Sequence, residues 1–405
     1  MMILAMAWRN VWRNPMRSFV ILASVAVGIF CGIMVLSIYK GMMTGRVRTV
    51  IESETGNLQL HDPRFADDMD PRYTIRDAGR LADSLGRLPG LSAFALRVIS
   101  PAMLTTATGS AGVQILGVDP LRESVVSGLD RKIVEGGGFG PDRKDAVLIG
   151  EKLASRLRLR TGAKLVLTFT DTASEIVSAA FRVAAIYRSD NTPLDERTVY
   201  VRMEALGEML GTGEAVHEAA VLLQDDGGTA SAKERLCRDF PGLRVQDWRE
   251  LNPETGLLVD TLDIYANIII TIILFALSFG IVNTMLMAIL ERTREIGLMT
   301  ALGFTRIRMF AMIFTETSLL TMAGTPFGFL SSWMLTAYYH ENGMDWSRMG
   351  KEMMGSFGFN TTLYPEYPTE RLPMVMAIVT VTAIFSCIFP ALKALRLSPM
   401  EALRK

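Results

Sequence analysis

Long runs without charged residues mark both ends of the chain. Ser18–Tyr39, Ile264–Leu290 and Leu372–Leu392 contain no Asp, Glu, Lys or Arg, and Glu316 is the one charged residue in Met309–Tyr339. A helix rises about 1.5 Å per residue, so about 20 apolar residues cross the hydrocarbon core of a bilayer. Each run reaches that length. The pattern predicts four transmembrane helices, over residues 18–43, 259–290, 306–339 and 372–392.

A cleaved signal peptide is the alternative interpretation of the first run. The run is longer than the apolar region of a signal peptide, and no small-x-small cleavage pattern follows in residues 39–43. We therefore interpret residues 18–43 as a retained span.

Residues 1–17 have an amphipathic pattern. Leu4, Trp8, Val11 and Trp12 recur at helical spacing, and polar residues occupy the other side. Tryptophan side chains favour the depth of the lipid headgroups. The sequence predicts a helix that lies in the membrane interface, and Pro15 allows a turn into the first span.

Basic residues near the span ends predict the orientation. With the N-terminus in the cytoplasm, eleven of them lie on the cytoplasmic side and seven lie close to a span on the other side. Basic flanks favour the cytoplasm, whereas charges within a long loop do not count. We expect both termini, the connection 291–305 and the tail 393–405 to be cytoplasmic, and residues 44–258 and the loop 340–371 to be outside. The expected location is the cell inner (plasma) membrane, as a multi-pass protein.

Residues 44–258 read as a soluble domain of alternating strands and helices. Its strands with the clearest bounds are Lys164–Thr170, Ile176–Tyr187 and Thr198–Arg202. The predicted fold class is a membrane protein with four transmembrane α-helices, an N-terminal interfacial amphipathic helix and a large two-lobed α+β extracytoplasmic (periplasmic) domain between spans one and two. Further strands are expected at 58–60, within 93–118, at 146–150 and at 219–223, and helices at 151–157, 203–210 and 229–240.

Residue types that catalyse reactions or bind metals are sparse. The histidines His61, His217 and His340 have no metal-ligand spacing among themselves or with the cysteines. The glycine-rich stretch 136–140 is followed by Pro-Asp instead of Gly-Lys-Ser/Thr, so we interpret it as a loop and not as a phosphate cradle. The formal net charge is zero, which gives no indication of nucleic acid binding. We predict no catalytic residue, metal site or bound cofactor in this chain.

The segment between the second and third spans carries the sharpest pattern. Its charged residues come first, an apolar stripe of Ile296, Leu298, Met299 and Leu302 follows at helical spacing, and Gly303 stands where a C-cap is expected. A short cytoplasmic helix with exposed apolar residues needs a partner, and we interpret that partner as a groove on another protein. A helix resting on lipid is the alternative. The residues predicted to contact the partner are Glu291, Arg292, Arg294, Glu295, Ile296, Gly297, Met299, Ala301 and Gly303.

This segment resembles the coupling helix of the FtsX-like permease family, which has the form E-R-x-x-E-I-G-x-x-x-A-x-G. Gly280–Met285 is similar to the second span of that family, and Pro390–Arg404 is similar to its closing P-x-x-x-A-x-x-x-x-P-x-E-A-L-R. More loosely, Gly56–Leu60, Leu116–Pro120 and Val147–Ala154 resemble the outer domains of the lipoprotein-releasing permeases LolC and LolE and of the efflux permease MacB.

The resemblance implies a permease subunit of a four-span (type VII) ABC transporter that is not itself an enzyme. A separate dimeric ABC ATPase would bind ATP and Mg²⁺, and a second permease, identical or homologous, would pair with this chain. MacB carries its ATPase at its N-terminus, whereas this chain has 17 residues before the first span and no Walker A motif. We therefore expect it to be more similar to LolC and LolE. Membrane lipid is a further expected partner, and nucleic acid is not.

Two polar residues within the predicted spans are candidate intramembrane site residues. Asn283 lies in the family-like stretch of span two, and Glu316 lies in span three. Ionisable groups within spans are functional as a rule. For Glu316, packing against a neighbouring helix is an equal alternative, and the four apolar runs named above contain no second charged residue that would form a proton relay.

The preferred function is lipoprotein extraction and release from the membrane. One alternative is MacB-like export of peptides, antibiotics or other amphiphiles. Another is FtsX-like signalling across the membrane to a cell-wall hydrolase. The sequence leaves open which substrate is moved, whether the permease pair is a homodimer or a heterodimer, whether its role is LolC-like or LolE-like, and whether a periplasmic carrier binds.

Overall fold

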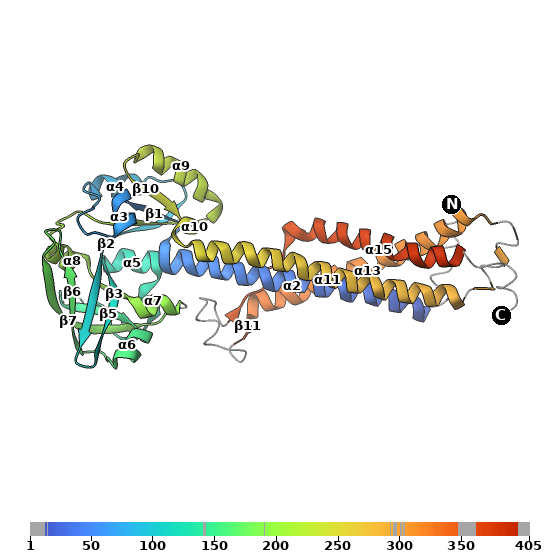
Figure 1. Ribbon diagram of the computed structural model, residues 1–405, viewed down its shortest axis with the longest axis horizontal. Coiled ribbons are helices and arrows are strands. Elements are labelled where there is room, and N and C mark those ends of the chain that lie inside the picture. Colours follow the sequence, from blue (N-terminus) through green and yellow to red (C-terminus); the bar gives the residue numbers. More distant parts are fainter. Residues whose placement is uncertain are drawn as a thin grey trace. The chain divides into compact units, whose positions relative to one another are not determined.

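The protein is described here by a computed structural model in which the chain forms two compact units (Figure 1). The helical unit consists of Met1–Met43, Val259–Asp345 and Thr362–Lys405, and the sheet unit of Thr44–Leu258 and Trp346–Thr361. The structure describes residues 13, 15–140, 143–189, 191–291, 293–294, 298–299, 302, 304–346 and 362–395. The predicted interfacial helix over 1–17 and the tail over 393–405 fall largely outside these residues.

Four long helices supply the helical unit: α2 (Pro15–Val50), α11 (Pro253–Glu291), α13 (Arg306–Asn342) and α15 (Leu372–Leu395). They share one apolar core, and it includes Ile21, Val25 and Ile29 of α2. A two-residue ribbon, β11 (Met344–Asp345) paired with β12 (Thr362–Leu363), follows α13. The other buried members of the core are Ile33, Leu36, Ala266, Ile270, Ile281, Met285, Ile289, Met309, Ile313, Leu320, Val375 and Val379.

Among the described residues, three stretches have the length and hydropathy of a membrane span: Ser18–Thr55, Pro253–Glu291 and Thr369–Ser386. The third predicted span, which corresponds to α13, does not reach that hydropathy. Its sequence includes Glu316, Pro326 and several threonines, which lower the average. The hydroxyls of Thr315, Thr317, Thr321 and Thr325 each donate to the backbone carbonyl four residues earlier. These bonds satisfy the hydroxyls within the helix. The count of four spans stays a prediction.

The sheet unit contains a ring of six strands. β2 (Leu91–Thr106) pairs with β3 (Gly109–Val118), β3 with β8 (Thr198–Arg202), and β8 with β5 (Ala146–Gly150). The ring then runs from β5 to β7 (Ile176–Tyr187), to β6 (Lys164–Thr170) and back to β2. The β3–β8 and β5–β7 pairs are parallel and the others antiparallel.

An open extension of the same sheet starts from the other end of β2. Residues 91–97 of β2 pair with β9 (Glu218–Leu223), β9 pairs with β1 (Leu58–His61), and β1 pairs with β10 (Arg244–Asp247), all antiparallel. β4 (Ile133–Gly136) adds to β7. Ring and extension therefore share β2 within one ten-stranded sheet. The predicted two-lobed layout stays a prediction.

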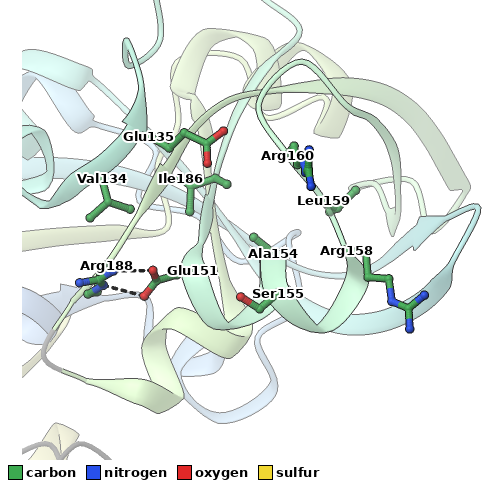
Figure 2. Close-up of a pocket in the computed structure, with 10 residues that line it drawn as sticks. All are labelled: Val134, Glu135, Glu151, Ala154, Ser155, Arg158, Leu159, Arg160, Ile186 and Arg188. Atoms are coloured by element: carbon green, nitrogen blue, oxygen red, sulfur yellow. Dashed lines mark hydrogen bonds and ion pairs between the residues drawn. The ribbon is translucent and has the colours of Figure 1, made fainter. Parts of the chain in front are cut away.

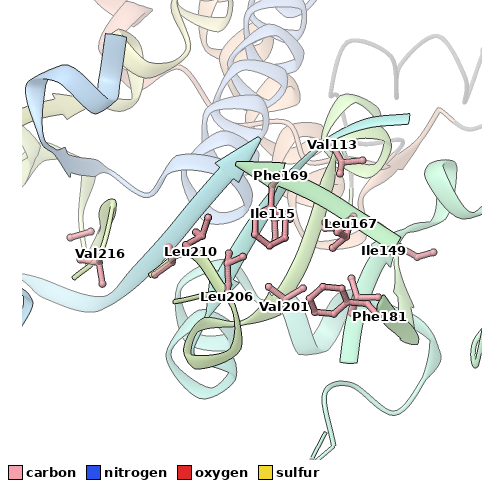
Figure 3. Close-up of a cluster of buried hydrophobic side chains, with 14 of the residues drawn as sticks. Val113, Ile115, Ile149, Leu167, Phe169, Phe181, Val201, Leu206, Leu210 and Val216 are labelled. Carbon is pink, nitrogen blue, oxygen red and sulfur yellow. The ribbon is translucent and has the colours of Figure 1, made fainter. Parts of the chain in front are cut away.

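Side chains from the ring strands form the main core of this unit (Figure 3). Val113 and Ile115 of β3, Leu167 and Phe169 of β6, and Phe181 of β7 are all buried. The core residues that come from the same strand are two positions apart, because successive side chains of a strand point to opposite faces. Ile149 and Val201 join them from β5 and β8, and Leu206 and Leu210 from the helix α8 (Met203–Leu210).

Short helices connect the strands, and several begin at an aspartate cap. Asp62, Asp119 and Asp247 each accept a hydrogen bond from a backbone N–H in the first turn of the helix that follows. These bonds satisfy N–H groups that have no partner within the helix. The remaining helices and turns are the π-helical η1 (Ile51–Thr55), α3 (Pro63–Asp68), α4 (Ala78–Leu85), α5 (Pro120–Ser127), η2 (Leu129–Lys132), α6 (Glu151–Leu157), α7 (Thr192–Arg197), η3 (Asp226–Gly228), α9 (Thr229–Asp239) and α10 (Trp248–Leu251).

Asp195 of α7 is a buried carboxyl with an altered pKa. Burial raises its pKa from 3.8 to about 6, although the hydroxyl and backbone N–H of Ser189 donate to it over 2.6 and 3.0 Å and act in the opposite direction. Between these two pKa values the native state holds a proton that the unfolded chain has lost. The contribution of this carboxyl to stability is therefore most favourable below about pH 4 and is lost as the pH rises towards about 6.

Asp195→Asn removes this titration while it keeps an oxygen for the Ser189 bonds. We expect the variant to raise the free energy of unfolding at about pH 7.5 by about 1–3 kcal/mol, and to change it little at about pH 4. Unfolding midpoints of the full chain at the two pH values measure this difference. Asp83→Asn, at an exposed aspartate, is the matched control. If the variant raised the free energy of unfolding equally at both pH values, the raised pKa of Asp195 would be contradicted.

Candidate functional site

Three of the nine residues predicted to contact an ATPase lie among the described residues. Glu291 is the last residue of α11, Arg294 is helical and exposed, and Met299 is helical and half-buried. The other six fall outside the described residues: Arg292, Glu295, Ile296, Gly297, Ala301 and Gly303.

The connection between α11 and α13 presents apolar side chains at its surface. The N–H of Leu302 donates to the carbonyl of Leu298 over 3.0 Å, which is a helical bond between residues four apart. The two leucines are 54% and 76% exposed. The apolar stripe predicted from the sequence is thus on the surface of this chain at both of these positions.

The two predicted intramembrane residues lie in different surroundings. Glu316 of α13 is only 4% exposed and is next to Thr317, which is also buried. Ile313 and Leu320, one turn on either side, belong to the apolar core of the helical unit. Asn283 of α11 is exposed. The structure therefore places Glu316 on the packed side of its helix, and it does not bury Asn283 within this chain.

Two glycines of α13 set a close contact with α2. A Cβ atom at Gly324 would lie 2.9 Å from the carbonyl oxygen of Leu22. A Cβ atom at Gly328 would lie 2.7 Å from the Cβ of Ile29 and 2.8 Å from the carbonyl oxygen of Ala26. Real side chains do not approach that closely, so the two backbones meet here because both positions are glycine. The sequence reasoning missed this contact, although the signal was present as a small-xxx-small pair within a predicted span.

Polar side chains join three of the long helices at one end of the helical unit. The hydroxyl of Tyr39 on α2 donates to Asp263 of α11 over 3.1 Å, and Asp263 also forms an ion pair with Arg371. Arg371, which ends the 3₁₀ turn η5 (Thr369–Arg371) before α15, further donates to Asn267 over 3.3 Å. Lys40 and Glu370 form a second ion pair at 2.9 Å. The sequence indicated the basic residues only as flanking charges, because the pattern does not show which helices are neighbours.

A buried ionic cluster lies within the sheet unit. The guanidinium of Arg97 donates to both oxygens of Glu123 over 2.9 and 2.7 Å, and to Glu218 over 2.6 Å. The side chains are 5%, 0% and 6% exposed. The two carboxylates keep the pKa of Arg97 above its usual range against the effect of burial. Arg97 is therefore permanently charged.

His217 stands close to this cluster in a fixed tautomer. Its Nδ1 accepts from the N–H of Ile99 over 3.0 Å, and its Nε2 donates to the carbonyl of Pro71 over 3.0 Å. Burial lowers the pKa of His217. The ring is therefore neutral and structural. Among the described residues, no group of three or more His, Cys, Asp or Glu side chains is placed to hold a metal ion.

A groove of about 580 Å³ on the sheet unit combines arginine and glutamate side chains (Figure 2). The guanidinium of Arg188 binds both oxygens of Glu151 over 2.6 and 2.5 Å, and Glu135 accepts from the hydroxyl of Thr161 over 2.7 Å. Arg158 and Arg160 also line it. Arg188 and Glu151 pair with each other across this lining, whereas the bond of Glu135 goes to Thr161 outside it.

Two family profiles match the chain over nearly its whole length. The profile described as the MacB-like periplasmic core domain matches residues 18–238, and the profile described as FtsX-like permease C-terminal matches residues 267–399. The chain belongs to the FtsX-like, MacB-type family of ABC transporter permeases. The permease carries its predicted coupling segment, Asn283 and Glu316 within the FtsX-like part.

Relatives of the permease include proteins from both branches that the sequence resembles. The transmembrane protein LolC of the lipoprotein-releasing system of Xylella fastidiosa (strain 9a5c) is 23% identical over 97% of this chain and 95% of its own length. The macrolide export ATP-binding/permease protein MacB 1/2 of Paracoccus denitrificans is 23% identical over 99% of this chain and 58% of its own length. The crystal structure of the periplasmic region of MacB from Actinobacillus actinomycetemcomitans aligns with 53% of this chain and 97% of that one, with 14% identity and a TM-score of 0.37.

Proposed function

We propose that the permease couples ATP hydrolysis by a separate ATPase to movement of its sheet unit, and that the work extracts and releases lipoproteins from the membrane. The observation that carries the proposal is the end-to-end match to LolC, which covers 97% of this chain and 95% of the relative. The permease itself would be a non-catalytic subunit. ATP and Mg²⁺ would be bound by the partner.

The docking point for the ATPase in this proposal is the connection 291–305. Leu298 and Leu302 support it, because an exposed pair of leucines at helical spacing is the kind of surface that enters a hydrophobic groove of a partner. Glu291 and Arg294 add charged side chains at the exposed start of the same segment. The other residues predicted to contact the ATPase are included because they lie in the same segment of the sequence.

The proposed topology has four spans and cytoplasmic termini in the inner membrane, with a two-lobed sheet unit on the outer side. The count of basic residues supports this orientation. α13 completes the four spans if its threonine hydroxyls remain bonded within the helix and Glu316 stays on the packed face. A second permease and a dimeric ATPase complete the proposed complex.

Export of an amphiphile is the second candidate. The match of the MacB-like periplasmic core profile to residues 18–238 favours it, as does the MacB relative that covers 99% of this chain. The match covers only 58% of that relative, whereas it covers 95% of LolC. The name of the MacB relative is therefore weaker support for the substrate of this permease than the name of LolC.

The test is ATP-driven release of a lipoprotein from vesicles that contain the permease together with the ATPase that co-purifies with it. We expect the wild type to release lipoprotein only with both proteins and ATP. Gly297→Leu places a bulky side chain in the coupling segment, and we expect ATPase co-purification, ATPase stimulation and release to fall together. In this proposal Glu295 pairs with a basic residue of the ATPase. Loss of one partner of a desolvated charge pair costs about 2–5 kcal/mol, so Glu295→Lys is then expected to act in the same way.

Glu341→Lys, at an exposed glutamate near the other end of α13, is the matched control and should retain ATPase binding. Unchanged ATPase binding by Gly297→Leu and Glu295→Lys would contradict the coupling role. Normal ATPase stimulation without lipoprotein release would instead contradict the substrate, and it would favour export.

A further inference from the structure

α2 and α11 each have one end within the sheet unit, at residues 44–50 and 253–258. Four residues connect these ends in a closed ring of hydrogen bonds. The guanidinium of Arg46 on α2 donates to Oε1 of Glu54 over 3.2 Å and to Oγ1 of Thr255 on α11 over 3.0 Å. The Nδ2 of Asn252, which precedes α11, donates to Oε2 of Glu54 over 3.3 Å, and its Oδ1 accepts from the N–H of Thr255 over 3.1 Å. We call these four residues the Arg46 ring.

The Arg46 ring is largely enclosed by the rest of the sheet unit. The side chains of Arg46 and Glu54 are 8% and 13% exposed, and Thr255 is 2% exposed. Apolar side chains hold packed elements together at least as well as a buried ion pair does, because taking two charges out of water is costly. Hydrogen bonds add direction, since each of them forms only at a particular distance and angle. The ring therefore fixes how α2 and α11 are rotated and aligned against each other at these residues.

On the α2 side, the ring leads into the sheet within two residues. Glu54 belongs to η1, which continues α2 directly and ends before Gly56. Gly56 has a φ of +72°, and a Cβ atom there would lie 2.7 Å from the carbonyl oxygen of Val221 in β9. The N–H of the next residue, Asn57, donates to the same carbonyl over 2.8 Å, and β1 follows. The turn at Gly56 thus holds the end of η1 directly against β9.

On the α11 side, the ring is attached to the strand next to β1. β10 ends at Asp247, which is opposite Leu58 at the start of β1. α10 follows β10, and one residue separates α10 from α11. Trp248 of α10 is buried in an apolar cluster with Val50 and Ile51, the last residue of α2 and the first of η1. Both helices therefore leave the sheet from one pair of adjacent strands, and polar and apolar contacts join them there.

We propose that Arg46 is a positioning residue for transport: it holds α2, α11 and the sheet in one fixed arrangement, so that a displacement of either helix end displaces the sheet unit. The inference rests on the function proposed above, in which ATP hydrolysis drives movement of that unit. Without the guanidinium, Glu54 and Thr255 lose their common partner, and each helix end is free to rotate or slide against the other. The ATPase would still bind and hydrolyse ATP, but less of that work would reach the sheet unit.

The first test measures how much lipoprotein the reconstituted complex releases per ATP hydrolysed. We expect Arg46→Met to lower this ratio about tenfold or more, because loss of a hydrogen bond to a charged group shifts an equilibrium by about that factor. ATPase binding and stimulation should stay near the wild-type level, since the proposed docking segment 291–305 is unchanged. Thr255→Val removes the acceptor of the second Arg46 bond and should act in the same direction. Thr255→Ser keeps a hydroxyl and should behave like the wild type.

Arg48→Met is the matched control, two residues further along α2. Arg48 lies 4.0 Å from Glu52, but the two side chains are 68% and 60% exposed. Exposed pairs contribute little, so the release ratio should not change. An unchanged ratio in Arg46→Met, or an equal loss in Arg48→Met or Thr255→Ser, would overturn the proposal. Loss of ATPase binding in both Arg46→Met and Thr255→Val would also overturn it, because the ring would then serve folding alone.

A second test does not depend on which substrate the permease moves. Spin labels at Cys237 of α9 and at Leu257→Cys of α11, both exposed positions, report the distance between the sheet unit and the start of α11. Cys31 and Cys387 are replaced by Ala in this chain. In complex with the ATPase, we expect one narrow distance distribution with and without ATP, and a broader one when Arg46→Met is added.

Two results of the distance measurement would refute the role of Arg46. One is a distance that changes with ATP while Arg46 is present, and the other is an equally narrow distribution in Arg46→Met. If the distances behave as expected but the wild type releases no lipoprotein, the proposed substrate is contradicted and the role of the Arg46 ring is supported.

Discussion

Arg97→Met is expected to lower the free energy of unfolding of the sheet unit by about 3–5 kcal/mol. The substitution removes the cation that both Glu123 and Glu218 contact, and it leaves two carboxylates buried side by side. A methionine fills similar space but offers neither charge nor donors. Hydrogen exchange of peptides from β2 and β9, measured by mass spectrometry on the full chain, reports the local stability.

Arg72→Met is the matched control for this effect. Arg72 also forms an ion pair, with Asp70 at 2.6 Å, but its side chain is 53% exposed. Exposed pairs contribute about 0–1 kcal/mol, so the control should change exchange little. Similar exchange rates in the two variants would contradict the view that the Arg97 cluster holds β2 and β9 together.

Gly328→Leu is expected to separate α13 from α2 and to lower the unfolding midpoint of the full chain in detergent by about 5 °C or more. The new Cβ alone would lie 2.7 Å from a side-chain carbon of Ile29 and 2.8 Å from a backbone oxygen of α2. Rotation of a side chain does not relieve a contact with backbone, so the helix axes must move apart. Gly324→Leu should act in the same direction.

Gly280→Leu on α11 is the control, because a Cβ atom at Gly280 meets nothing within 4 Å. The same chemical change in another long helix should leave the midpoint close to that of the wild type. If Gly328→Leu and Gly280→Leu are equally stable, the glycine pair does not determine how α2 and α13 pack.

Much of the local structure could be predicted from the sequence. The strands Lys164–Thr170, Ile176–Tyr187 and Thr198–Arg202 have the predicted bounds, because apolar residues alternate or cluster between turn residues. Helix α9 ends at Asp239, one residue before the predicted end, and β9 begins at Glu218, one residue earlier than predicted. The order of strands in the sheet could not be predicted, since pairing depends on contacts between residues far apart in the sequence.

Several short strands and helices were not predicted, because their sequence patterns are brief. β4 and β10 are four residues each, which is too short for an alternating pattern to stand out, and β4 exposes three of its residues. α3, α5 and α7 each begin with Pro at the first or second helical position, and we did not use that signal. Aspartate caps precede α3 and α5 and were equally available in the sequence.

Candidate sites within one short stretch of sequence could be predicted, and those that join distant residues could not. The family-like connection 291–305 was visible because charge, apolar stripe and glycine lie within a few consecutive residues. The Tyr39–Asp263–Arg371 group and the Gly324–Gly328 contact each depend on which helix is the neighbour, and the pattern along one helix does not contain that information. The Arg97 cluster joins residues 97, 123 and 218 for the same reason.

The position of β1 in the sheet constrains how the protein is made. β1 lies between β9 and β10, and its first partner begins at Glu218, more than 150 residues after His61. A ribosome adds about 5–20 residues per second, so β1 has no strand to pair with for roughly ten seconds or longer. During that time its two edges are open to other chains. Residues 58–61 can therefore pair only after the far end of the domain has been synthesised, and this part of the sheet forms late.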